Sequence, residues 1–77
     1  MPRYFFVLAD HEVLPDPSGT ELSDDNAARV EAILFSGAWL RDHPEMVWDG
    51  KEMRVIVRDE EHRTLFTLIT LSVDCAA

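Results

Sequence analysis

The residue types best suited to metal binding gather in one short segment. Asp10, His11 and Glu12 are consecutive and Asp16 follows, so one imidazole and three carboxylates lie within residues 10–16. A metal site needs three or four ligands that converge at a fixed geometry, and this spacing matches neither a zinc pattern nor the alternating acidic pattern of a calcium loop. We therefore interpret the segment as a solvated loop and expect no metal and no cofactor. A small-molecule or metal site in loop 10–16 stays open as an alternative.

Residues suited to covalent or acid–base catalysis are scattered rather than clustered. Cys75 lies next to the end of the chain without a neighbouring base, and Asp24 and Asp25 stand where a helix begins. His43 precedes Pro44 at the expected end of that helix, where an imidazolium can meet the helix dipole. The sequence has no Gly-x-Ser-x-Gly elbow and no glycine-rich phosphate loop. We therefore expect that the chain is not an enzyme and has no catalytic residues.

Length and charge limit the classes of protein that remain. The 77 residues suffice for a single domain, 1–77, in which we expect 73–77 to be a flexible tail. The net charge of −8 repels phosphate backbones and anionic lipids, so we expect neither nucleic-acid nor membrane binding. We expect no signal peptide and no membrane-spanning segment, and the single cysteine excludes a disulfide within the chain. These features predict a cytoplasmic protein.

Hydrophobic alternation and turn residues predict the order strand, short strand, helix, strand, strand. Residues 3–8 are apolar on both faces, which is typical of a central strand, and 53–58 and 64–73 flank a charged turn. Prolines and a glycine between 9 and 20 mark a loop before a short strand near 19–22. A right-handed crossover then gives an α+β fold, ββαββ, with a four-stranded antiparallel sheet of order 2-1-3-4 and the helix packed on one face.

The helix is predicted over residues 25–41, after Ser23 or Asp24 as N-cap and before Pro44. It has two apolar stripes, and we assign the first of them to the sheet. That stripe consists of Ala27, Val30, Ile33, Leu34, Gly37 and Leu40. We expect Val30, Ile33 and Leu34 to be almost fully buried, and their predicted contacts are Phe6, Val55 and Phe66 or Leu68.

The second stripe of the helix is the predicted interaction surface. It contains Ala28, Ala32, Phe35 and Trp39, and Trp48 follows on the next connection. One sheet cannot cover a helix that is apolar on most sides, so this stripe predicts a partner surface. The alternative is a minor core in which Phe35, Trp39 and Trp48 cover one another.

Several short segments together resemble a family of short bacterial proteins known only as a domain of unknown function. They are the Met-Pro-Arg-Tyr-Phe-Phe start, Gly-x-Glu-Leu at 19–22, Ala-Ala-Arg-x-Glu-Ala at 27–32, and Leu-Phe-Thr-Leu at 65–68. Val7 and His62 depart from the pattern, which commonly has aspartate and glycine there. The resemblance implies a short cytoplasmic protein and no particular activity.

Besides the small-molecule or metal binder using loop 10–16, two kinds of function remain from the sequence. The first is a small non-enzymatic interaction module that binds another protein or a second copy of itself as a homodimer. The second is a small antitoxin-like regulatory protein, an analogy of fold alone that lacks the basic segment needed to bind DNA.

Overall fold

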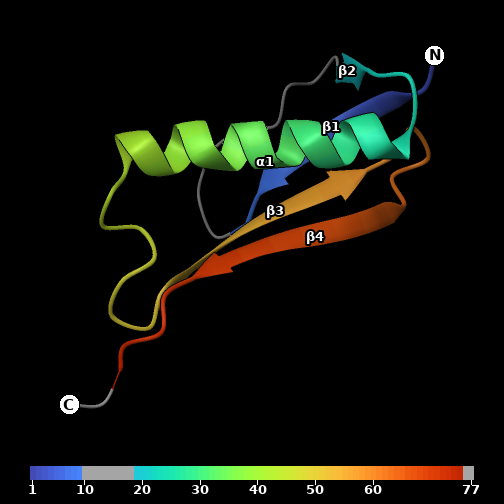
Figure 1. The fold of residues 1–77 in the computed structure, drawn as a ribbon. Helices are drawn as coiled ribbons and strands as arrows, with labels where there is room; N and C mark the ends of the chain where they lie inside the picture. The colour runs from blue at the N-terminus through green and yellow to red at the C-terminus, as the bar shows by residue number, and fades with distance from the viewer. Residues whose placement is uncertain (10–18, 76–77) are drawn as a thin grey trace.

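The computed structural model describes residues 1–9 and 19–75, and in them it contains four strands and one helix in the predicted order. The elements are β1 (Arg3–Leu8), β2 (Thr20–Glu21), α1 (Asp25–Asp42), β3 (Glu52–Arg58) and β4 (Thr64–Leu71). The strands form one antiparallel sheet of order β2-β1-β3-β4, which confirms the predicted α+β fold. Figure 1 shows α1 lying across one face of this sheet.

The two central strands of the sheet, β1 and β3, are far apart in the sequence. Phe6 of β1 is opposite Val57 of β3, and Leu8 is opposite Val55. Val55 in turn is opposite Leu68 of β4. Since side chains alternate along a strand, these residues share the face that α1 covers. The core of the described residues is built there, from Tyr4, Leu8, Ala28, Ala32, Met53, Val55 and Val57.

The ends of α1 are fixed by the residues expected to fix them. The Asp24 carboxylate accepts a hydrogen bond from the Ala27 backbone N–H at 2.8 Å, which satisfies one of the free donors of the first turn. At the other end, His43 Nδ1 lies 2.9 Å from the Trp39 carbonyl oxygen. The His43 ring also stacks on the Trp39 ring, with 3.8 Å between centroids. His43 therefore caps the helix.

The predicted orientation of the helix was wrong. Ala28, Ala32 and Ser36 are the buried residues of α1, whereas Val30, Ile33 and Leu34 are all more than half exposed. The buried residues recur every four positions and are small, so the helix backbone can approach a sheet surface already filled by large side chains. The larger aliphatic residues are the more hydrophobic, but facing inward they would hold the helix farther from the sheet.

The connection between α1 and β3 ends in the turn that the sequence indicated. Asp49 and Gly50 both have positive φ angles, 59° and 80°, and the Lys51 N–H donates to the Trp48 carbonyl at 3.2 Å. Two successive left-handed residues are typical of a type I′ turn, for which Asp-Gly is a preferred pair. This turn reverses the chain directly before β3.

The β3–β4 hairpin closes around one carboxylate. Asp59 Oδ1 accepts hydrogen bonds from the Glu61 and Arg63 backbone N–H groups at 2.8 and 3.0 Å. The Arg63 side chain donates to Asp59 Oδ2 at 2.9 Å. These hydrogen bonds, above all the one from the Arg63 backbone N–H, hold the pKa of Asp59 below its usual value. His62, next in this turn, has a φ of 63°, in the region that favours glycine.

Replacing His62 by glycine is expected to stabilise the domain by about 0.5–1 kcal/mol. A left-handed conformation costs a residue with a Cβ about 1–2 kcal/mol, and the greater freedom of glycine in the unfolded chain offsets part of the gain. The ring contact between His62 and Phe5, at 6.1 Å, is lost as well. Urea denaturation measures the change. His62→Ala is the control, because alanine keeps the strain; equal stabilisation by both variants would contradict this explanation.

Candidate interaction surface

The structure divides the predicted interaction residues between the core and the surface. Ala28 and Ala32 are buried against the sheet, and Phe35 and Trp39 are partly buried and pack on the same core. The prediction of these four as an exposed stripe is thus corrected. The prediction assigned the two faces of the helix the wrong way round, because both stripes are apolar and they differ only in the size of their side chains.

Trp48, the fifth predicted residue, is half exposed on the connection between α1 and β3. Its indole N–H donates to the Pro44 carbonyl oxygen at 2.9 Å, which fixes the ring against its own loop. The Ser72 hydroxyl donates to the carbonyl of the neighbouring Val47, so the loop is also tied to the end of β4. Phe35 and Trp39 join the main core rather than a separate cluster around Trp48.

The outward face of α1 carries the exposed apolar residues of the helix. Val30, Ile33 and Leu34 are 55, 58 and 60% exposed, and their spacing puts them within one turn of one another. Gly37 continues this face, and a Cβ added to it would meet nothing within 4 Å. A glycine in an exposed helix costs about 1 kcal/mol relative to alanine, and packing within the monomer does not require it. These four residues are called the α1 outer face below.

The sheet face turned away from α1 is also apolar in part. Phe5, Val7 and Ile56 alternate with the core residues and are half-buried. Ile69 and Leu71 of β4 are about half exposed. The sequence predicted two apolar faces for residues 3–8, and the register places Val7 of β1 opposite Ile56 of β3 on the second face.

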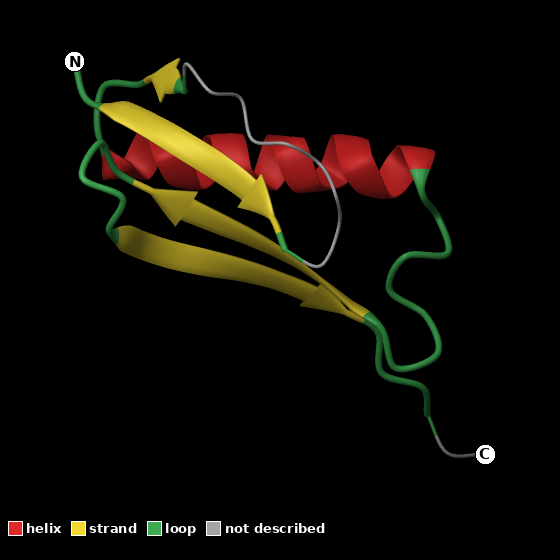
Figure 2. Cartoon of the chain, turned by 180° about the vertical axis from the view of Figure 1, so that it is seen from behind, coloured by secondary structure: helices red, strands yellow, loops and turns green. Residues whose placement is uncertain are grey.

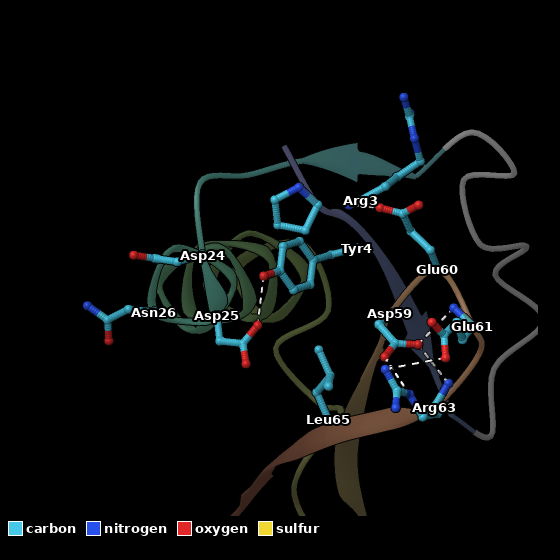
Figure 3. A pocket seen from close by; sticks show the side chains of 11 residues that line it. Arg3, Tyr4, Asp24, Asp25, Asn26, Asp59, Glu60, Glu61, Arg63 and Leu65 are labelled. Atoms are coloured by element: carbon cyan, nitrogen blue, oxygen red, sulfur yellow. Dashed lines mark hydrogen bonds and ion pairs between the residues drawn. The ribbon is translucent and has the colours of Figure 1, made fainter.

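A hollow of about 820 Å³ lies at the start of α1, between the helix, β1 and the β3–β4 hairpin (Figure 3). Most of its lining is charged: Arg3, Asp24, Asp25, Asp59, Glu60, Glu61 and Arg63. Several of these groups are engaged with near neighbours. The Tyr4 hydroxyl donates to Asp25 at 2.7 Å and Arg3 pairs with Glu21 at 2.7 Å. Together with the Arg63–Asp59 pair, these contacts hold the strands, the hairpin and the helix start together, which is a structural role.

Tyr4 should titrate far above an ordinary tyrosine. Its hydrogen bond to the Asp25 carboxylate, together with burial, raises the pKa of Tyr4 from 10.0 to about 12. Because the folded pKa is the higher one, this contribution to stability is complete below pH 10 and is lost as the pH rises through about 12. Tyr4 is the only tyrosine, so phenolate absorbance follows it directly. Asp25→Ala should return the pKa toward 10.0, with circular dichroism confirming the fold at each pH. An unchanged midpoint in that variant would contradict the assignment.

The loop considered for metal binding, with Asp10, His11, Glu12 and Asp16, lies outside the described residues. Within residues 1–9 and 19–75, no three His, Cys, Asp or Glu side chains gather closely enough to hold a metal ion. In the same part of the chain, no helix combines the length and hydropathy needed to cross a membrane.

Comparison with known proteins identifies a family. The family model for a domain of unknown function, DUF6894, matches residues 3–72, nearly the whole chain and every strand and helix described above. No curated protein and no solved structure matches the chain. The chain therefore belongs to the DUF6894 family.

Proposed function

We propose that this chain is a small, non-enzymatic, cytoplasmic interaction module that binds a partner protein through the α1 outer face. The observation that carries the proposal is the exposure of Val30, Ile33 and Leu34 on adjacent turns. Anchors at i, i+3 and i+4 are the pattern by which an amphipathic helix is recognised in an apolar groove. Isolated apolar residues are common on protein surfaces, whereas a contiguous apolar patch marks a contact site.

Charge favours a protein as the partner. A net charge of −8 disfavours nucleic acids and anionic membranes, whose phosphates would be repelled. Arg29 and Arg41 are the basic residues of α1, and both are exposed. They lie near the apolar side chains on the helix surface, so a partner with an apolar groove and an acidic rim suits this face.

The test compares two variants that add the same charge to α1, one within its outer face and one a turn further along at the margin of that face. Leu34→Glu places a carboxylate within the α1 outer face, and Ala38→Glu places one at an exposed position four residues later, at the margin of that face. Each variant and the wild type is immobilised, and proteins captured from the native cell are quantified. A partner bound by the wild type and by Ala38→Glu, and reduced at least about tenfold by Leu34→Glu, supports the proposal.

Two results would overturn the proposal. One is a partner that Leu34→Glu binds as well as the wild type does, which would place the contact elsewhere. The other is that the wild type captures no protein above the level of an inert bait. Thermal melts of both variants establish that they are folded, which we expect because both substitutions are on exposed helix positions.

A further inference from the structure

β4 presents an open edge to solvent. In the described residues the strand order is β2-β1-β3-β4, so β4 pairs with β3 on one side alone (Figure 2). It has 8 residues, whereas β2, at the opposite edge, has 2. An edge strand offers a row of backbone N–H and C=O groups that a further strand can pair with. The long edge of this sheet is therefore β4.

The β4 edge lacks the sequence features, such as charged residues and prolines, that prevent edge strands from pairing with other strands. Residues 64–73 contain no charged residue, no proline and no glycine, although 29% of the chain is charged. The register shift of the β3–β4 pair lies at the hairpin end, between Val57 and Arg58, and leaves the pairing from Glu52 to Val57 regular. At the other edge, Glu21 of β2 is charged and pairs with Arg3. One edge is thus short and charged, and the other is long and uncharged.

We propose that β4 pairs antiparallel with β4 of a second copy, so that two four-stranded sheets join into one sheet across a two-fold axis. This interface is separate from the α1 outer face and goes beyond the function proposed above. An antiparallel pair of identical strands is self-complementary, since every backbone hydrogen bond on one side of the two-fold axis is repeated on the other.

The lack of charged residues in β4 favours this strand for the contact. Two copies with a net charge of −8 repel each other, and like charges directly opposite across a strand pair add to the cost. Within residues 64–73 no register can place two charged side chains opposite each other. The strand is also incompletely covered in the monomer, because Phe66 and Leu68 are half-buried and Ile69 and Leu71 are exposed. Pairing would satisfy the backbone and cover part of all four side chains.

The joined sheet would be closed rather than open-ended. The two-fold axis places both β4 edges inside the joined sheet, and at each outer edge β2 pairs with Arg3 and Tyr4 of β1. Since paired residues of antiparallel strands point to the same side, both α1 helices would lie on one face of the joined sheet. The dimer would then present two α1 outer faces to partners on the same side.

The experiment measures the molar mass by light scattering behind a sizing column, over a range of protein concentrations. The wild type should form a dimer, and higher salt should strengthen it by screening the charge of −8 on each chain. Ile69→Lys and Thr67→Lys each put a charge on an exposed position of β4, and each should raise the dimer dissociation constant at least about tenfold. Leu34→Lys, an identical charge change on α1, should leave that constant unchanged.

Hydrogen exchange localises the contact independently. Amides of residues 64–71 should exchange more slowly at high protein concentration than at low, while amides of α1 should not change. A wild type that stays monomeric at every concentration overturns the inference. So does a dimer that Leu34→Lys dissociates and Ile69→Lys does not, a result that would instead support contact through α1. Open-ended aggregation in place of a dimer would also contradict the closed two-fold pair.

Discussion

Leu8→Ala is expected to lower the free energy of unfolding by about 2–5 kcal/mol. Leu8 is 2% exposed at the end of β1 and lies opposite Val55, on the face that α1 covers. Truncation removes apolar contacts and leaves a cavity that the surrounding strands can fill only in part. A domain of this size has roughly 3–5 kcal/mol of stability, so the variant should be largely unfolded at physiological temperature.

Leu34→Ala is the matched control for Leu8→Ala, because it makes the same chemical change at a side chain that is 60% exposed. Its effect should stay within about 0.5 kcal/mol, the range of ordinary surface substitutions. Urea denaturation followed by circular dichroism gives both values. The pair is decisive because the sequence placed Leu34 in the core. A larger loss for Leu34→Ala than for Leu8→Ala would show that the helix faces the other way.

Ala32→Leu is expected to destabilise the domain by about 1–3 kcal/mol, through too much side chain rather than too little. Ala32 is 1% exposed between α1 and the sheet, where neighbouring large side chains already fill the space. A leucine there must push the helix outward or adopt a strained rotamer. The unfolding free energy from urea denaturation measures the loss.

Ala38→Leu is the control for Ala32→Leu, since Ala38 is exposed on the same helix. Alanine and leucine have similar helix propensities, so this change should leave the stability nearly the same. If both variants were equally stable, the small residues of α1 would not be setting its distance from the sheet. Their spacing would then have no part in the orientation of the helix.

The sequence was sufficient for the topology because each boundary depends on local chemistry. Asp24 caps the helix, Asp49-Gly50 forms a turn, and the apolar residues of 3–8 require a central strand. With these fixed, the right-handed crossover leaves few sheet orders, and 2-1-3-4 is the one observed. Such signals extend over a few residues, and a single sequence contains them in full.

Those local signals do not determine how α1 is rotated about its own axis. Hydrophobicity ranks Val30, Ile33 and Leu34 above Ala28 and Ala32, yet the alanines face the sheet. The signal that distinguishes the stripes is volume, because the core side of the sheet already carries large residues such as Tyr4 and needs small ones opposite. The exposed face of the helix was misplaced for the same reason, because turning the helix over exchanges its buried and its exposed residues.

The central position of β1 has a consequence for synthesis on the ribosome. Phe6 finds its place in the sheet only beside Val57, which is made 51 residues later, since 57 − 6 = 51. α1 can form as soon as it emerges, but the strand surface that it covers is incomplete until β3 follows. Contacts so distant in sequence carry the largest cost of loop closure. The core can therefore close only after β3 has emerged, and the apolar strand β1 is exposed to chaperones until then.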